Sequence, residues 1–286
     1  MPPILTIARL TILEASRRWL LLALLVLTLV VIGGTGYGFS RLWTISNGGQ
    51  PLGEVAVHTI ASQLLILIAF VFAAVLALSS TLVASPSISG DVESGQVLAL
   101  LSRPVRRSEL VLGKWLGLAV LVLLYSAGAV GLEMIVTNWV TGYLPPHPIQ
   151  LIAYIGVEGL VLLSLALLMS TRLAGMTGGI IALVMYFIAW IGGIVGGVGT
   201  ALNNDVLTHI GTASKLLLPT DLLWRGAVYA LEPASIVAGF RTAGRALAAN
   251  PFAATDPPPP AFLLWVVAWL ALMVGLTIWS FRRREL

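Results

Sequence analysis

The sequence contains no cysteine, and charged residues make up only 10% of its 286 residues. The lack of cysteine excludes disulfides, thiolate metal sites and cysteine catalysis. Soluble domains carry about 25% charged residues, which cover the surface around the core. This chain is 58% hydrophobic with a mean hydropathy of +0.98 and cannot form such a surface. Lipid is therefore its expected solvent.

Six apolar segments are long enough to cross a bilayer, which requires about 20 residues of helix. They cover residues 19–39, 57–80, 112–137, 151–170, 176–199 and 261–281. Each must be helical, because an open strand would leave backbone groups unpaired in lipid. The first is too long for a signal-peptide core, so we interpret it as a retained span. The sequence predicts an all-α integral membrane protein with six transmembrane helices.

The distribution of basic residues predicts the orientation of these spans. The net charge is +4 and the pI about 9.8, but the basic residues flank apolar runs and do not indicate a nucleic-acid partner. With the N-terminus inside, eleven of the sixteen fall in cytoplasmic segments, as the positive-inside rule requires. The other five are Arg41, Lys215, Arg225, Arg241 and Arg245. We expect both termini to be cytoplasmic, in a multi-pass protein of a prokaryotic plasma (inner) membrane.

We interpret residues 1–286 as a single transmembrane domain with three notable segments outside the spans. Residues 1–18 suggest a short helix on the inner membrane surface, with a plain cytoplasmic stub as the alternative. Residues 86–111 form a cytoplasmic loop. Residues 200–260 form an external loop with an amphipathic helix at 216–231 and a proline run that predicts an extended lead into the last span.

Glycines are concentrated in the fifth predicted span. Gly192 and Gly196, and likewise Gly193 and Gly197, are pairs of small residues four positions apart. Such pairs allow two helices to approach closely in lipid. The alternative is a flexible or broken helix end, and the two interpretations are compatible.

The cytoplasmic stretch 88–114 is the most informative part of the chain. An acidic turn with Asp91 and Glu93 precedes Gly95, and a short apolar helix is expected at 97–101. Arg-Pro ends that helix, since proline removes a donor and disfavours helix before it. Ser108 is then the expected N-cap of a helix that continues into the third span. The pattern predicts a short surface helix tied to a transmembrane helix, either to transmit force from a soluble partner or simply to hold the loop at the lipid.

This stretch resembles the corresponding loop of type 2 ATP-binding-cassette (ABC) exporter permeases, in particular the NosY-like group. The matching residues are Glu93, Gly95, Leu100, Leu101, Pro104, Val105, Arg107, Glu109, Leu110, Gly113 and Lys114. Gln96 departs from the pattern, where the family usually has threonine. The motif covers about 27 residues, and the six-span topology with both ends inside also agrees with this family.

The resemblance implies a permease subunit that forms a homodimer and pairs with two cytosolic ABC ATPase subunits. The loop helix would dock on the ATPase as a coupling helix, and ATP binding would shift the spans between two accessibilities. The implied ATPase-coupling residues are Asp91, Glu93, Gly95, Leu100, Leu101, Pro104, Arg107 and Glu109. ATP and Mg²⁺ would be bound by the partner, because Gln96 stands where a P-loop requires lysine. We expect no cofactor and no metal on this chain.

Polar residues within the spans are the candidates for a translocation path. Charge inside a membrane is costly and tends to face a cavity or a partner. Gln63, Glu133 and Glu158 all lie toward the external side of their predicted spans. The alternative for the carboxylates is an interfacial position that reaches the lipid headgroups.

Three other functions remain as alternatives to transport. The resemblance also allows a NosY-like subunit that supports maturation of an extracytoplasmic metalloenzyme. An intramembrane enzyme acting on lipid would need clustered carboxylates or histidines at one depth, which the sequence does not suggest. A structural anchor would not need a coupling helix. The sequence does not specify the cargo or distinguish export from import.

Overall fold

The computed structural model describes residues 3–16, 19–47, 50–95 and 106–284. These residues are mainly helical, with one short antiparallel hairpin that pairs Ser46 with Pro51. The elements are α1 (Pro3–Ser16), α2 (Trp19–Leu42), β1 (Ser46–Asn47), β2 (Gln50–Pro51), α3 (Glu54–Glu93), α5 (Arg107–Thr141), α6 (Pro148–Ser170), α7 (Thr177–Leu202), α8 (Asp205–Leu217), α9 (Asp221–Leu231), α10 (Ala234–Ala243), the 3₁₀ helix η1 (Gly244–Leu247) and α11 (Pro260–Arg282).

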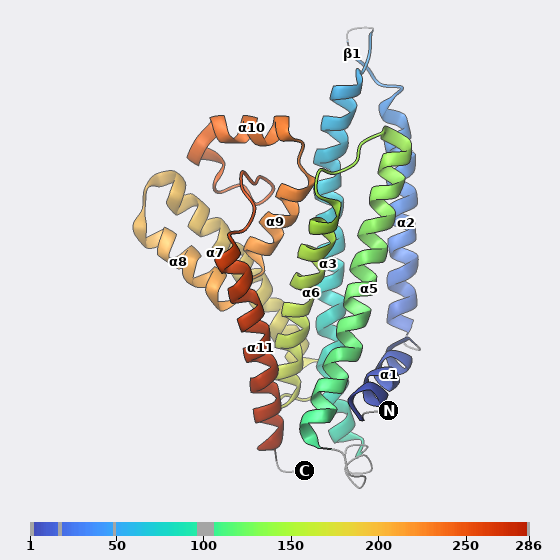
Figure 1. The fold of residues 1–286 in the computed structure, drawn as a ribbon, viewed down its shortest axis with the longest axis vertical. Helices are drawn as coiled ribbons and strands as arrows, with labels where there is room; N and C mark the ends of the chain where they lie inside the picture. The colour runs from blue at the N-terminus through green and yellow to red at the C-terminus, as the bar shows by residue number, and fades with distance from the viewer. Residues whose placement is uncertain (1–2, 17–18, 48–49, 96–105, 285–286) are drawn as a thin grey trace.

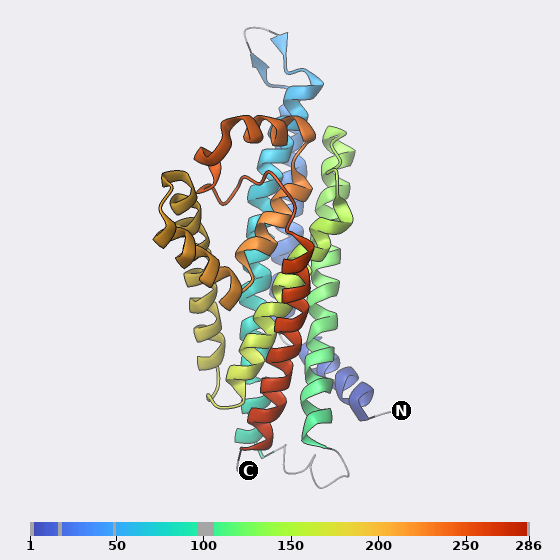
Figure 2. The ribbon, with the colours of Figure 1, turned by 60° about the vertical axis from the view of Figure 1, so that its left-hand side comes forward.

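Within the described residues, six helices are long and apolar enough to cross a membrane, namely α2, α3, α5, α6, α7 and α11. They correspond one to one with the six predicted spans, so that prediction is confirmed. Both termini lie at the same end of the bundle (Figures 1 and 2), which we call the terminus end. The opposite end, with the β1–β2 hairpin and α10, is the distal end.

Two helices extend well beyond their predicted spans at the terminus end. α3 has 40 residues and α5 has 35. The expected loop at 86–111 is therefore shorter, because residues 86–93 continue α3 and residues 107–111 begin α5. The expected apolar helix at 97–101 lies outside the described residues.

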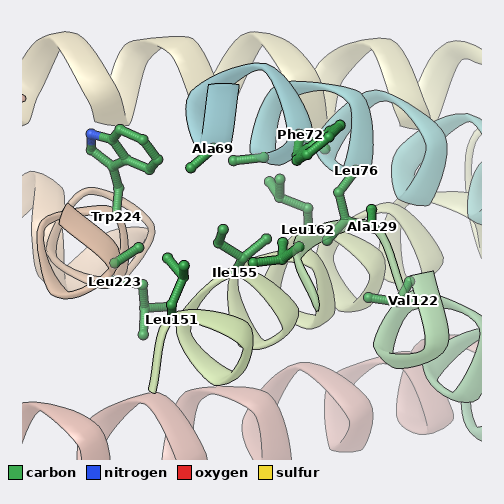
Figure 3. Packing of buried hydrophobic residues seen from close by; sticks show 14 of the residues in the cluster. Ala69, Phe72, Leu76, Val122, Ala129, Leu151, Ile155, Leu162, Leu223 and Trp224 are labelled. Carbon is green, nitrogen blue, oxygen red and sulfur yellow. The ribbon is translucent and has the colours of Figure 1, made fainter. Parts of the chain in front are cut away.

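α6 is the most enclosed of the six spans and contacts α3, α5, α7, α9 and α11. Figure 3 shows Ile155 and Leu162 of α6 beside Phe72 and Leu76 of α3 in the main apolar cluster. Gly159 brings the helices close, since a Cβ there would lie 2.9 Å from Leu76 Cδ2. Lipid is as apolar as these side chains, so close packing must contribute much of the association energy.

α1 packs against α5 through a pair of small residues that the sequence analysis did not single out for this role. A Cβ at Gly117 would lie 2.6 Å from the Ala8 carbonyl oxygen, and one at Gly113 would lie 2.6 Å from Ile7 Cβ. Ala8, Thr11 and Ala15 are the buried residues of α1. The predicted helix at the N-terminus is confirmed over residues 3–16, and it lies against the bundle.

The glycine pairs of α7 also permit close packing, here against α8. The Cα of Gly211 would lie 2.7 Å from a Cβ at Gly196, and α7 stays helical through Leu202. The predicted helix at 216–231 is confirmed only over residues 221–231, which form α9. α8 ends at Leu217 and α9 begins at Asp221, because Pro219 in the linker has no backbone N–H to continue a helix.

The remainder of segment 200–260 forms a helical cap at the distal end. α9 leads to α10, η1 follows, and the chain returns to α11 (Figure 1). Pro259 has φ −63° and ψ 146°, and Pro260 is the first residue of α11. The predicted extended proline lead is therefore confirmed, and proline is well suited to the first turn of a helix.

Candidate functional site

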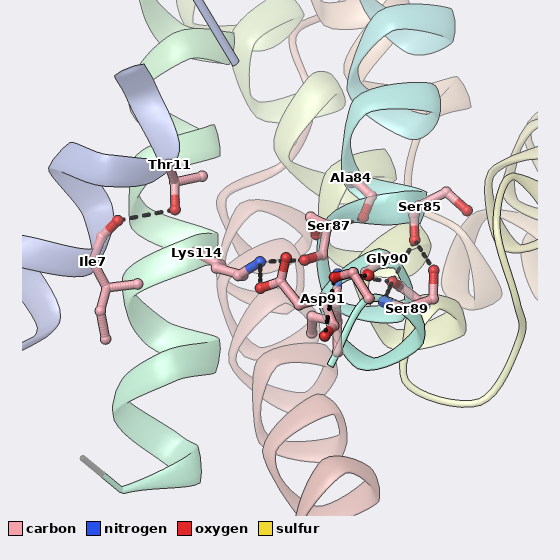
Figure 4. Close-up of polar contacts among 12 residues, drawn as sticks. Ile7, Thr11, Ala84, Ser85, Ser87, Ser89, Gly90, Asp91 and Lys114 are labelled. Carbon is pink, nitrogen blue, oxygen red and sulfur yellow. Dashed lines mark hydrogen bonds and ion pairs between the residues drawn. The ribbon is translucent and has the colours of Figure 1, made fainter. Parts of the chain in front are cut away.

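The predicted coupling residues that the structure describes lie at helix ends, close to where α3 ends and α5 begins. Asp91 is in the last turn of α3 rather than in an acidic turn, because α3 remains helical through Glu93. Its carboxylate pairs with the Lys114 ammonium of α5, which also donates to the Ser87 carbonyl (Figure 4). Lys114 and Asp91 have side chains only 6% and 13% exposed. This ion pair fixes the end of α3 to the first turns of α5.

Glu93 joins α3 to the turn between α6 and α7. Its Oε1 accepts a hydrogen bond of 3.2 Å from the Gly175 backbone N–H. Gly95 follows with φ +72°, a left-handed conformation that favours glycine just after a helix. These two predicted residues therefore also shape the end of α3.

Arg107 connects the start of α5 with the end of α11. Its Nη1 donates to the carbonyls of Phe281, Arg282 and Arg284, at 3.3, 3.1 and 2.8 Å. These carbonyls end a helix and need such donors. Arg284 in turn donates to the Thr171 carbonyl at 2.8 Å, which links α11 to the end of α6.

Glu109 has a local role in starting α5. It accepts a hydrogen bond of 2.7 Å from the backbone N–H of Arg106, the residue that precedes the helix. The predicted N-cap at Ser108 is wrong, because Ser108 already lies in the first turn. Leu100, Leu101 and Pro104, the other predicted coupling residues, lie outside the described residues.

The backbone of α3 on either side of Pro86 contacts neighbouring helices. Pro86 has no N–H, which interrupts the helical hydrogen bonding. Ser170 at the end of α6 accepts from the backbone N–H groups of Ile88 and Ser89 and donates to the Ser85 carbonyl. The Ser85 hydroxyl donates to the Gly175 carbonyl at 2.9 Å. The terminus end of α3 is thus hydrogen-bonded to α6 and to the turn before α7.

The three predicted path residues lie beside different neighbours. Glu133 lies beside Thr35 of α2, Glu158 beside Tyr186 of α7, and Gln63 near Glu232. Both glutamates are 2% exposed, so they face the interior of the chain and not its surface. Their carboxylate oxygens have no hydrogen-bond partner within the described parts of the chain. Unpaired ionisable groups at membrane depth are costly and mark functional positions by default.

Sequence analysis did not single out Glu232, which lies between α9 and α10. It is 2% exposed, and burial raises the pKa of its carboxyl to about 8. The neighbouring Tyr143 hydroxyl donates to the Leu231 carbonyl, and burial raises the pKa of Tyr143 as well. A lone acid directly after an apolar helix was the only sequence signal for this position.

We expect the contribution of Glu232 to stability to fall as the pH rises from about 4.5 to about 8, because folded Glu232 holds its proton over this range and the unfolded chain releases it. The loss amounts to at most about 5 kcal/mol, since one pKa unit corresponds to about 1.4 kcal/mol. Glu232→Gln should flatten the dependence of melting temperature on pH in detergent. The exposed Glu54→Gln is the control and should follow the wild type; identical profiles for all three proteins would contradict this prediction.

Asp221, the first residue of α9, is the centre of a buried charge cluster. Its Oδ2 lies 3.7 Å from Lys215 Nζ and 3.3 Å from Arg225 Nε, and its side chain is fully buried. Gly193 makes room for it, since a Cβ there would lie 2.1 Å from the Asp221 carboxylate. Burial lowers the pKa of the Lys215 ammonium, and the negative charge of Asp221 opposes that shift.

These features define a multi-pass helical membrane protein whose helix ends are joined by polar contacts at one end of the bundle. Residues 5–286 match the family profile described as "ABC-2 family transporter protein", and the chain belongs to this family. It is similar to the "Probable ABC transporter permease protein NosY" of Pseudomonas aeruginosa, with 32% identity over 118 residues. That match covers 41% of this chain and 39% of the relative, so less than half of either protein is aligned.

Proposed function

We propose that this chain is the membrane-spanning permease subunit of an ABC transporter in a prokaryotic plasma membrane. It moves a substrate across the bilayer using ATP hydrolysis, which takes place on a separate cytosolic ATPase that binds ATP and Mg²⁺. The terminus end faces the cytoplasm in this proposal. Membership of the transporter family and the excess of basic residues at that end support it.

One observation supports the coupling mechanism most strongly: the helix ends beside segment 94–106 are linked to one another. Asp91 connects α3 to α5, Glu93 connects α3 to the turn before α7, and Arg107 connects α5 to α11. An ATPase that binds segment 94–106 and changes conformation would therefore move several spans together. Packed elements with two discrete arrangements can carry such coupling over a long distance.

The complex contains two copies of the permease and two ATPase subunits in this proposal. Gln63, Glu133 and Glu158 contribute to the translocation path. The burial of Glu133 and Glu158, whose carboxylate oxygens have no hydrogen-bond partner among the described residues, supports a role in the path over contact with lipid headgroups.

Glu93→Lys tests this proposal directly. Lysine cannot accept the Gly175 N–H and places a cation at the end of α3. We expect membrane insertion to be normal, ATP hydrolysis to continue and substrate transport to fall to background. The measurement is ATP-driven uptake or release in vesicles that contain both subunits.

Two further substitutions control for position and for charge. Glu54→Lys makes the same charge change at an exposed site of the distal end and should transport normally. Glu93→Gln keeps an oxygen acceptor for Gly175 and shows whether the negative charge is also needed. Normal transport by Glu93→Lys with normal ATPase docking would refute the assignment.

A second function is favoured by the NosY match. In this version the complex supports maturation of an extracytoplasmic metalloenzyme. The genes beside the one for this chain distinguish the two, because a maturation system is encoded together with its target enzyme.

A further inference from the structure

The helical cap at the distal end contains a cavity of about 470 Å³. It is lined by residues of α7, α8, α9, α10 and η1 and by the chain around residues 253–256. This volume is within the range of about 300–1,000 Å³ that is common for small-molecule sites. The cap lies outside the six candidate spans, and the transport mechanism proposed above assigns no role to it.

Four basic side chains line this cavity, and they are the four that the positive-inside rule left unexplained in segment 200–260. They are Lys215, Arg225, Arg241 and Arg245. They come from α8, α9, α10 and η1, so the fold brings them together from separate elements. Two carboxylates are close to them, Asp256 in the lining and Asp221 beside Lys215 and Arg225. The cations therefore outnumber the nearby carboxylates by two.

One donor of these side chains, the Arg225 Nη2, is buried without a hydrogen-bond partner within the described part of the chain. The Nε of Arg225 donates a hydrogen bond to Asp221, and its Nη1 donates to the Asn250 carbonyl. Arg241 uses Nη2 for Asp256 and for the Thr255 carbonyl, at 2.9 and 3.1 Å. A buried guanidinium N–H without a partner is costly, and an oxyanion in the cavity would satisfy it.

The rest of the lining is largely apolar, with Leu222, Phe240, Leu247 and Ala253 among its residues. A site with clustered cations and an apolar wall fits an anionic group attached to a hydrophobic body. Arginine forms paired hydrogen bonds with phosphate oxygens, which makes phosphate the best-matched anion.

We propose that this cavity is a binding site for a phosphate-bearing ligand, either the headgroup of an anionic lipid or a free phosphate compound. Binding does not require the ATPase, so failure of this proposal would leave the transporter function intact. In the same way, a chain that lacked transport activity could still bind the ligand.

The test uses the full chain in nanodiscs of phosphatidylcholine, with thermal unfolding and calorimetric titration as readouts. Two probes distinguish the sources: inorganic phosphate and dihexanoyl phosphatidic acid, with dihexanoyl phosphatidylcholine as the zwitterionic reference. Saturable binding of phosphatidic acid alone would indicate a lipid headgroup. Equal binding of both anions would indicate that the phosphate group itself is recognised. Absence of binding by either anion would overturn the proposal.

The double substitution Arg241→Gln with Arg245→Gln tests the location. Both side chains are exposed, and their contacts with Asp256 and Asn203 are surface contacts of small energy, so the melting temperature without probe should change little. We expect at least about tenfold weaker binding, since the variant loses charge-assisted hydrogen bonds to the phosphate oxygens. Arg41→Gln removes the fifth basic residue outside the cytoplasmic segments and should bind like the wild type. Unchanged affinity in the double variant would overturn the proposed site.

Discussion

Lys114→Met is expected to destabilise the protein by about 3–5 kcal/mol, the usual cost of breaking a buried ion pair by removing one partner. The Asp91 carboxylate and the Ser87 carbonyl would both lose their donor in a region where neither has free access to water. We expect a marked fall in melting temperature and in the yield of monodisperse protein. Size-exclusion chromatography after heating in detergent measures both quantities.

The double variant Asp91→Leu with Lys114→Met provides the matched comparison. Replacing both ionic partners by apolar groups is often neutral or stabilising, so most of the loss should be recovered. Arg9→Met, at an exposed position of α1, should behave like the wild type. If the double variant were as unstable as the single one, the stabilisation would not come from the pairing of Asp91 with Lys114.

Gly211→Ala is expected to destabilise the contact between α7 and α8 by about 1–3 kcal/mol, the typical cost of overpacking. The new Cβ would lie 2.3 Å from the Gly196 Cα, which is backbone and cannot rotate away. The two helices must therefore separate along the whole glycine-rich face. The melting temperature in detergent measures the effect.

Gly239→Ala is the control for this prediction, and its effect should have the opposite sign. Gly239 lies inside α10 with nothing within 4 Å of an added Cβ. Alanine there should stabilise the helix by up to about 1 kcal/mol through its higher helix propensity. A destabilisation of equal size at both positions would show that backbone proximity is not the cause.

The sequence predicts the six spans well because each depends on a local property, the length of an apolar run. It predicts less about where the long helices end. Asp91 and Glu93 suggest a turn in isolation, yet both remain in α3 because contacts with Lys114 and Gly175 support that end. Such contacts join residues that are distant in sequence, and no local pattern reveals them.

In the candidate site, too, the sequence identifies residues but not their distant contacts. The motif identifies Glu93 and Arg107, but their partners, a backbone N–H and three helix-terminal carbonyls, carry no side-chain signature. Only the fold places Asp221 beside Lys215 and Arg225. The positive-inside rule showed that Lys215, Arg225, Arg241 and Arg245 lie outside the expected cytoplasmic segments. It could not show that the four side chains line one cavity.

Cross-linking from a single introduced thiol tests the central claim most directly, and the absence of native cysteine makes the label unique. Ser94→Cys places an exposed thiol just after α3, and Ser46→Cys places one in the distal hairpin as the control. We predict that a short bifunctional reagent in native membranes links the Ser94→Cys variant to a cytosolic ABC ATPase and leaves the Ser46→Cys variant unlinked. Linkage from the hairpin alone, or labelling of position 94 only from outside the cell, would contradict the proposed coupling.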